Sequence, residues 1–437
     1  MNLRKVFVGM AALLVAGLLP FSAFLKTLSA GSGNNDNSDK AIRYGTSHIT
    51  GAMESNVYFG NYWQSVGSDD ATDSNKEPVK WRVLSNDGNL FVVSDQNLDC
   101  IAYNSSAETV TWEDCSLRKW LNGKFIDRAF TAQEQSAVLE SFVENQDGAK
   151  GSEAGADTYD KIYLLSIYEV IDPELGFPTD WKDKSGLRVA LNTEYAKSKG
   201  AMTDADMAGA WWLRTPGDAG NAANVFNAGN VFVRGGSVNN FIFAVRPAMN
   251  IDASKVLFAS PAEDGKTSGV PGADAMQEVD SYTGSDWKLT IKDDTRPVFD
   301  ASVSGSKTIL KDGAVKLTYT GAATGANEYV SAMIVDADGN ILYYGNIVDN
   351  TSADAAGSGK AAINVPAELT PGNYEVKVFS EQCNGSFKTD LASNIVTLDI
   401  TISKYSTSDR NLCIGIGVAV VAACVAVVFA VRKKKRA

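Results

Sequence analysis

Histidine is almost absent from this sequence. The 437 residues contain one, His48, and only five cysteines. A Ser-His-Asp triad needs a histidine beside its nucleophile, and zinc sites in proteins need clustered histidines and cysteines. His48 lies in a polar segment with no second histidine. The sequence therefore predicts no histidine-based catalysis, no metal site and no cofactor.

Positive charge is also in deficit. Lysine and arginine number 40 against 52 aspartates and glutamates, which gives a net charge of −12. Several of the basic residues lie at the two ends, including the run at 432–436, so the intervening chain is more acidic still. An acidic surface repels phosphate backbones. We therefore expect no nucleic-acid partner.

Long apolar runs are confined to the two ends of the chain. Residues 1–30 begin with a short basic region followed by an apolar run, the pattern of a secretory signal peptide, with an uncleaved anchor as the alternative. Residues 413–431 carry no charge and predict a transmembrane helix. The basic segment 432–437 then predicts a cytoplasmic tail. These patterns predict a single-pass protein of the cell membrane, with the membrane as a partner and an extracellular ectodomain.

Cysteine is too scarce to form a disulfide framework. Cys413 and Cys424 lie in the expected span, and Cys383 has no partner nearby in the sequence. Cys100 and Cys115 are close enough in sequence to form a disulfide outside the cytosol. Two buried free thiols are the alternative, because cysteine is often buried without a partner.

Composition divides the region between the two apolar ends. An aromatic-rich part is followed by a stretch rich in Gly, Ser, Asp and Ala, and then by a part with strand-like alternation. The expected order is a disordered segment (31–40), a first domain (41–252), a connector (253–295), a second domain (296–402) and a stalk (403–412).

The first domain mixes strand and helix signals. Residues 79–95 predict a hairpin, because two β-rich runs flank the turn sequence "NDGN". Residues 115–125 have helical spacing of apolar side chains, and Thr131 with Glu134 forms the pattern of a helix capping box. Residues 210–249 read as short strands broken by Gly and Asn. The expected class is α+β, with helices and an irregular antiparallel sheet.

Several motifs in this domain resemble a known family. They are "FGNYWQ" (59–64), "WRVLS" (81–85), "LRKWLN" (117–122), "WWLRTPG" (211–217) and "VRPAM" (245–249). Their order is similar to that of an extracellular domain of unknown function found in Gram-positive gut bacteria. The later motifs are also distantly similar to C-type-lectin-like folds and to formylglycine-generating enzymes. The resemblance implies a lectin-like head without an assigned activity. The catalytic cysteines of those enzymes are missing, since 201–252 contain none.

The second domain, 296–402, shows a series of β-rich runs separated by turns. The sequence "LTPGNYEVKV" (369–378) resembles strands of immunoglobulin-like modules. That resemblance implies an all-β immunoglobulin-like sandwich, which is built from this many short strands.

The sequence "WWLRTPG" raises the question of a ligand site, since aromatic rings and fork-shaped arginines suit sugar binding. Successive strand residues point to opposite faces, so we expect one tryptophan in the core and the other on a ligand surface. Arg214 and Arg246 have a second interpretation, as buried ion pairs with Asp95 or Asp218. The candidate ligand-binding residues are Trp211, Trp212, Arg214, Asn224, Asn227, Arg234 and Arg246.

The function that these patterns favour is non-catalytic recognition or adhesion, with cell-surface or host glycans or proteins as partners. Two alternatives stay open. A glycosidase-like hydrolase needs only two carboxylates, and the chain has many. A structural envelope protein needs no ligand of its own.

Overall fold

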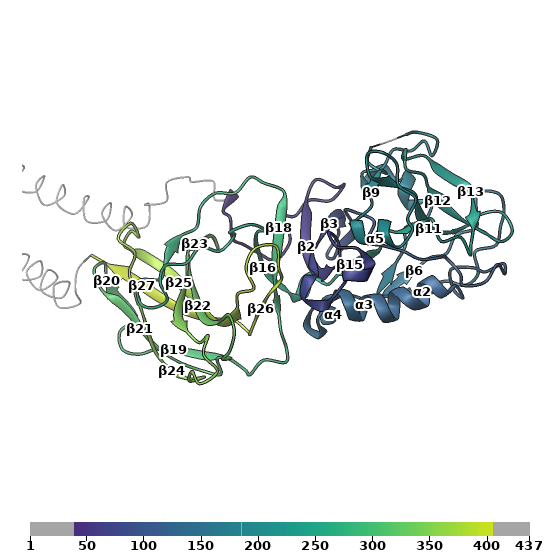
Figure 1. Cartoon of the computed structure of the whole chain (residues 1–437). Coiled ribbons are helices and arrows are strands. Elements are labelled where there is room, and N and C mark those ends of the chain that lie inside the picture. The colour runs from purple at the N-terminus through teal and green to yellow at the C-terminus, as the bar shows by residue number, and fades with distance from the viewer. Residues whose placement is uncertain (1–38, 185, 405–437) are drawn as a thin grey trace, which may run out of the picture.

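The structure is a computed structural model that describes residues 39–184 and 186–404 (Figure 1). The expected signal peptide, transmembrane span and cytoplasmic tail lie outside these residues, as do most of 31–40 and 403–412. Strands account for 39% of the described residues and helices for 11%. The expected α+β head with a C-terminal membrane helix is therefore wrong as a fold class, because the chain forms mostly sheet.

The prediction of a membrane-spanning helix is corrected as well. Over residues 39–184 and 186–404, no helix is both long enough and apolar enough to cross a bilayer. The single C-terminal span, the membrane as a partner and the cell-membrane location are accordingly not supported. The segment on which they rested, 413–431, lies outside the described part of the chain.

One mixed sheet of 15 strands runs through both parts of the chain that the structure describes. Its main path, in spatial order, is β17 (Gln277–Glu278), β23 (Ile341–Asp349), β22 (Glu328–Val335), β25 (Gly372–Gln382), β26 (Asp390–Ala392), β18 (Asp286–Lys292), β2 (Asn56–Tyr62), β3 (Glu77–Asn86), β4 (Leu90–Ser94), β15 (Ala248–Ile251) and β8 (Ile162–Tyr163). Four further strands pair beside this path: β1 (Arg43–Tyr44), β16 (Val256–Pro261), β20 (Thr308–Leu310) and β27 (Val396–Ser403).

Strand β18 joins the two parts of the chain. It pairs in parallel with β2 through Asp286–Lys288 and with β26 through Thr290–Lys292, and antiparallel with β16. Figure 1 shows β16 and β18 between the strands of the first part and those of the second. The segment 253–295 thus contributes β16, β17 and β18 to the sheet, and its register with β2 brings side chains from distant parts of the sequence together.

The strands of the first part form where apolar residues alternate. In β3, Val79, Trp81 and Val83 are buried while their neighbours Lys80 and Arg82 are partly exposed, as the two-residue period of a strand requires. The hairpin predicted over 79–95 corresponds to β3 and β4, which pair antiparallel. The buried face belongs to a core that extends through the first part of the chain and into β18.

A second, five-stranded sheet covers this core. It consists, in spatial order, of β13 (Val231–Ser237), β12 (Asn221–Val225), β11 (Trp211–Pro216), β14 (Ala244–Val245) and β5 (Asp99–Cys100). Two small pairs accompany it: β9 (Ala190–Leu191) with β10 (Ala208–Gly209), and β6 (Ser141–Val143) with β7 (Thr158–Asp160).

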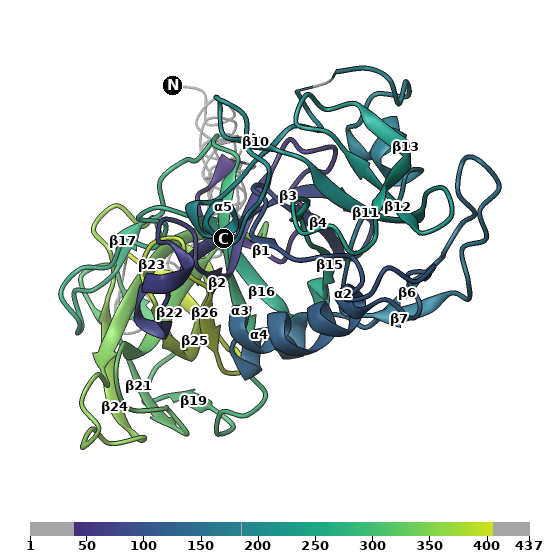
Figure 2. The same ribbon diagram turned by 45° about the vertical axis from the view of Figure 1, so that its right-hand side comes forward.

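Short helices lie along one edge of the first part (Figure 2). They are α2 (Ser116–Trp120), α3 (Ile126–Ala129) and α4 (Ala132–Ala137), with a π-helical turn over Leu121–Phe125 between α2 and α3. A further helix, α5 (Glu194–Ser198), lies apart from this row. The capping box predicted from Thr131 and Glu134 is confirmed at the start of α4. Its two reciprocal hydrogen bonds satisfy otherwise unpaired N–H groups of the first turn.

The second part is formed by two packed sheets. Strands β19 (Asp300–Val303), β21 (Ala314–Thr320) and β24 (Gly359–Asn364) form a three-stranded sheet. Its apolar side chains, such as Leu317 and Ile363, share one core with Val330, Val376 and Ile400 of the large sheet. The strand positions predicted for 296–402 therefore correspond to β21–β25 and β27, arranged as layers of sheet around an apolar interior.

Candidate ligand-binding cleft

Both tryptophans of "WWLRTPG" are fully buried. Trp211 and Trp212 lie on β11, every residue of which is buried. Their indole N–H groups donate to main-chain oxygens, that of Trp211 to Arg188 and that of Trp212 to Ile101, each at 3.1 Å. The expectation of one outward ring is wrong, because both faces of β11 are covered. Strand alternation separates the rings without bringing either one to solvent.

The two arginines are also structural. Arg214 pairs through both terminal nitrogens with the carboxylate of Glu169. The guanidinium of Arg246 lies over the ring of Trp211 at 4.9 Å and donates from Nε to the carbonyl oxygen of Ser94 at 2.9 Å. Burial, together with the nearby positive charge of the Arg82 side chain, lowers the pKa of Arg246 to about 9. Neither side chain is available to a ligand from solvent.

The two aspartates that the sequence suggested as ion-pair partners of these arginines pair with other side chains. Asp95 accepts from Nε of Arg82 at 2.5 Å, and Asp218 lies 3.7 Å from Arg234. Arg234 itself is exposed on β13. Neither Asp95 nor Asp218 makes an ion pair with Arg214 or Arg246, so the buried ion pair that does form uses a glutamate that spacing alone did not indicate.

The candidate asparagines do not assemble a surface with the tryptophans. Asn224 is fully buried opposite Trp212 in the β11–β12 pairing. Asn227 is half-buried and donates to Asp204 at 3.0 Å. The seven candidate ligand residues are therefore divided between the interior and separate parts of the surface, and they form no common site.

Cys100 and Cys115 are free thiols. The sulfur of Cys115 accepts a hydrogen bond from the main-chain N–H of Arg118 and so caps α2, whereas Cys100 donates to the carbonyl oxygen of Phe241 at 2.9 Å. Burial is the main cause that raises the pKa of each thiol to about 12. Of the two alternatives for this pair, the structure has the unbonded one.

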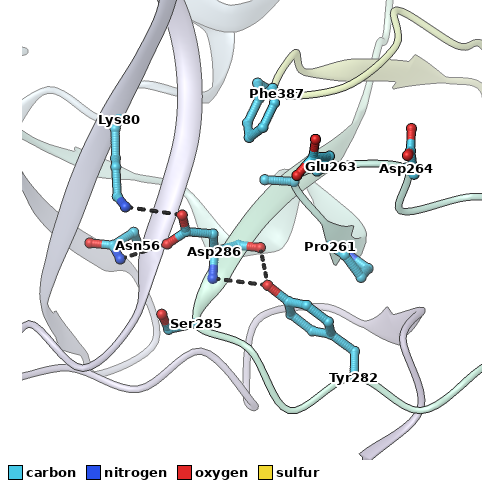
Figure 3. Close-up of a pocket in the computed structure, with 10 residues that line it drawn as sticks. Asn56, Lys80, Pro261, Glu263, Asp264, Tyr282, Ser285, Asp286 and Phe387 are labelled. Carbon is cyan, nitrogen blue, oxygen red and sulfur yellow. Dashed lines mark hydrogen bonds and ion pairs between the residues drawn. The ribbon is translucent and has the colours of Figure 1, made fainter.

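A different site lies where the two parts of the chain meet. Two loops, the one after β16 and the one between β25 and β26, border a cavity of about 590 Å³ beside β2, β3 and the start of β18 (Figure 3). The residues that line it are Asn56, Lys80, Pro261, Ala262, Glu263, Asp264, Tyr282, Ser285, Asp286 and Phe387.

Asp286 is the centre of the polar wall of this cleft. Its carboxylate accepts from the Lys80 ammonium at 3.0 Å and from the Asn56 amide at 2.8 Å. The Tyr282 hydroxyl donates to the main-chain carbonyl oxygen of Asp286 at 2.8 Å. The parallel β2–β18 register places Asp286 directly beside Asn56. The sheet pairing therefore fixes this carboxylate.

The aromatic wall comes from the loop between β25 and β26. The ring of Phe387 lies 4.8 Å from that of Tyr58, at 57°. Phe387 has a backbone φ of 63°, a left-handed conformation that is unusual for a bulky residue, and its N–H donates to the Ala262 oxygen at 2.6 Å. Figure 3 shows this ring and Tyr282 on opposite sides of Asp286 and Glu263. Strained conformations of this kind often mark ligand sites.

The rim of the cleft is acidic. Glu263 and Asp264 are exposed, and the Asp264 carboxylate accepts from the Ser386 hydroxyl of the facing loop at 3.3 Å. A second hollow, of about 570 Å³, is also lined by Phe387 and includes Tyr58 in its wall. Its polar lining residues are Gln64, Ser65, Glu77, Gln96, Asn192, Thr193 and Glu194. The Phe387 side chain is thus part of the lining of both hollows.

Burial raises the pKa of Tyr58 to about 12, and the negative charges of Asp286 and Asp95 add to this effect. The Tyr58 hydroxyl therefore stays protonated at neutral pH and can donate a hydrogen bond. Within the described residues, no group of three or more His, Cys, Asp or Glu side chains could hold a metal ion. The chemistry that this cleft offers is hydrogen bonding and stacking on an aromatic face.

Sequence reasoning missed this cleft. Lys80 lies in the hairpin predicted over 79–95, but nothing in the sequence indicates that Asp286 and Asn56 lie beside it. Phe387 lies in a loop with no local motif. The run at 286–294 has apolar alternation typical of a strand, but it does not indicate which strands would pair with it.

Comparisons with known proteins identify a related family for only one region of the chain. Residues 87–253 match the family described as "Domain of unknown function (DUF6273)". No curated protein matches the chain. A solved structure described as "AvmM Catalyzes Macrocyclization in Alchivemycin A Biosynthesis" matches 31% of this chain and 98% of its own, with 8% identity and a TM-score of 0.20. That similarity is too low to support an argument. The first part of the chain therefore contains a region similar to a domain without an assigned activity.

Proposed function

We propose that this chain is a non-catalytic recognition protein that binds a carbohydrate in the cleft between its two parts. The observation that carries the proposal is the Phe387 ring, held in a left-handed backbone conformation against Tyr58. It forms an aromatic wall beside the fixed carboxylate of Asp286. Sugar rings bind by laying apolar C–H faces on aromatic rings while a few fixed polar groups bind the hydroxyls.

The size and charge of the cleft narrow the ligand class. Its volume of about 590 Å³ lies within the usual range for small-ligand pockets. Lys80 is the one cationic side chain in the lining, against Glu263, Asp264 and Asp286. The excess of negative charge disfavours phosphorylated or sulfated ligands. A neutral sugar or an amino sugar fits best.

The hydrolase alternative is less well supported. Glycosidases need a pair of carboxyl groups facing the scissile bond, one of them with a raised pKa. Asp286 is held by the Lys80 ammonium and the Asn56 amide, which favours a positioning role. Glu263 and Asp264 are exposed at the rim of the cleft. Binding without bond cleavage is therefore the function we favour.

The test is a glycan array probed with the full chain, followed by calorimetric measurement of Kd for any glycan that binds. Phe387→Ala should weaken binding at least about tenfold, since a buried aromatic contact is worth roughly 1.4 kcal/mol or more. Phe142→Ala is the control, because Phe142 is an exposed aromatic side chain on β6, away from the cleft. It should leave Kd unchanged.

Asp286→Asn provides a second measurement, since it keeps the shape of the side chain and removes its charge. We expect weaker binding with the same fold by circular dichroism. The proposal fails if no glycan binds the folded chain, or if Phe387→Ala and Phe142→Ala bind equally well.

A further inference from the structure

Four oppositely charged side chains are buried together next to the cleft. They are Lys266, Lys288, Glu381 and Asp390, and the exposed fraction of each side chain is at most 5%. Two cations and two anions balance in charge. Burying an ion is costly even when it is paired, so a cluster of four without access to water needs an explanation beyond stability.

The sheet pairing brings the four together. Lys288 lies on β18, and Asp390 begins β26 opposite Thr290 of β18 in the parallel register. Glu381 is near the end of β25, the other neighbour of β26. Lys266 enters from the segment between β16 and β17. Three strands and one loop therefore meet at a single point.

The contacts of Lys266 are the ones that matter for chemistry. Its Nζ lies 2.6 Å from Oδ2 of Asp390. The same amine donates a short hydrogen bond to Oε1 of Glu381 and another to Oγ1 of Thr290 at 3.2 Å. The contact with Asp390 does not have hydrogen-bond geometry, since Oδ2 has no hydrogen-bond partner among the described residues. The amine thus touches one carboxylate while its proton is directed to another.

Lys288 approaches the same oxygen from β18. Its Nζ lies 2.7 Å from Oδ2 of Asp390 and donates to the carbonyl oxygen of Gly385 at 2.7 Å. The other carboxylate oxygen of Asp390 accepts from the main-chain N–H of Asn384 at 2.7 Å. Positive charge and a backbone donor therefore surround the Asp390 carboxylate.

Aromatic rings enclose the cluster. Nζ of Lys266 lies 5.1 Å from the centre of the Phe258 ring and 5.8 Å from that of Tyr344. The Tyr344 hydroxyl donates to Oε2 of Glu381 at 2.7 Å. These rings keep bulk water away from the contact between the amine and the carboxylate.

We propose that Lys266 and Asp390 condense to a side-chain amide, which cross-links the segment after β16 to the start of β26. Glu381 takes one proton from the Lys266 ammonium, which frees the nitrogen lone pair. The nitrogen bonds to Cγ of Asp390, and the negative charge that develops on Oδ2 is stabilised by the Lys288 ammonium, in the manner of an oxyanion site.

The remaining steps return Glu381 and Lys288 to their starting charge states, while Lys266 and Asp390 become the amide. The C–Oδ2 bond breaks, and the oxygen leaves as water with two of the three ammonium protons, one of them delivered by Glu381. One ammonium and one carboxylate become one amide and one water, so atoms and charge balance without an oxidant or a co-reactant. Lys288 and Glu381 then remain buried, and their positive and negative charges balance. Exclusion of water disfavours the reverse hydrolysis.

The hydrogen-bond acceptors of the two lysines indicate that Lys266, and not Lys288, is the nucleophile. Lys266 has a carboxylate proton acceptor in Glu381, whereas the proton of Lys288 is directed to a main-chain carbonyl that cannot take it. The cross-link would also join the two rims of the cleft, because Lys266 follows Asp264 closely and Asp390 follows the loop that carries Phe387. The proposal does not depend on the identity of any ligand.

Peptide mapping of the purified full chain by mass spectrometry is the test. A free Lys266 is cut by trypsin and yields separate peptides. A cross-linked chain yields 256–288, uncut at Lys266, joined to 389–404, with a mass lower than the two peptides together by one water. Finding this branched peptide supports the proposal. Finding only unlinked peptides from folded wild-type protein overturns it, whatever the variants do.

Three variants test the roles. Lys266→Arg should abolish the cross-link, and Lys288→Arg, the matched control that keeps a cation beside Asp390, should retain it. Glu381→Gln should fold yet remain unlinked. A branched peptide through Lys288 in place of Lys266 would overturn the assignment of the nucleophile. Normal cross-linking in folded Glu381→Gln would overturn the role of Glu381 as the proton carrier.

Discussion

The single histidine offers a quantitative test of the structure through pH. His48 contacts Trp287 edge-on, with ring centres 4.6 Å apart, and the Arg43 guanidinium lies over the same indole at 5.1 Å. Burial and the charge of Arg43 lower the pKa of His48 from 6.5 to about 4. The folded protein therefore holds this imidazole neutral at pH values where the unfolded chain protonates it.

The sign of the effect follows from proton binding. Between pH 6.5 and about 4 the unfolded state binds more protons at His48 than the folded state, so the free energy of unfolding falls as the pH falls. The contribution is complete above pH 6.5 and is lost progressively toward pH 4. Each unit by which the pKa is lowered corresponds to about 1.4 kcal/mol. The contribution of His48 to the free energy of unfolding therefore has an upper limit of about 3.4 kcal/mol. His48 is only partly buried, so screening by solvent reduces the expected loss to about 1–2 kcal/mol.

The assay is urea unfolding of the full chain and of His48→Gln at pH 7.5, 6.0 and 4.5. Carboxylates titrate in both proteins, but the variant lacks the imidazole, so the difference between the two pH profiles isolates His48. We expect wild type to lose about 1–2 kcal/mol more than the variant on acidification. Parallel profiles would show that His48 is not buried against Trp287 and Arg43, and would refute the reasoning.

Two further predictions concern the core and the junction. Trp211→Ala and Trp212→Ala should each lower the free energy of unfolding by about 3–5 kcal/mol, measured by urea unfolding, because both rings are fully buried; a near-neutral effect at either position would place that ring on the surface. A fragment of residues 296–404 should be less stable than one of residues 253–404 by at least about 3 kcal/mol in the same assay, since it leaves Glu381 and Asp390 buried without Lys266 and Lys288. Equal stability of the two fragments would contradict this account of the junction.

Local sequence patterns predicted those elements correctly whose formation depends on neighbouring residues. The hairpin over 79–95, the capping box of Thr131 and Glu134, and the strands of 296–402 follow from alternation, turn residues and side-chain caps within a few positions of each other. The acidic composition and the shortage of histidine likewise need no folding to interpret. The match of residues 87–253 to a domain of unknown function also rests on sequence alone.

What failed depended on contacts between distant segments. The rings of "WWLRTPG" alternate as a strand requires, yet sequence could not show that both faces of β11 are covered, so one ring was expected outside. The partner of Arg214 is Glu169 because the chain folds back on itself, and no spacing rule indicates that pair.

By itself, then, the sequence determined the local elements, the scarcity of catalytic histidine and the sign of the surface charge, because each depends on composition or on neighbours along the chain. Tertiary structure alone decided that β18 joins both parts in one sheet through parallel pairings with β2 and β26. Those pairings connect residues far apart in the sequence, and they place Asp286 beside Asn56 and Lys288 beside Asp390. The cleft and the buried ion cluster both exist for that reason.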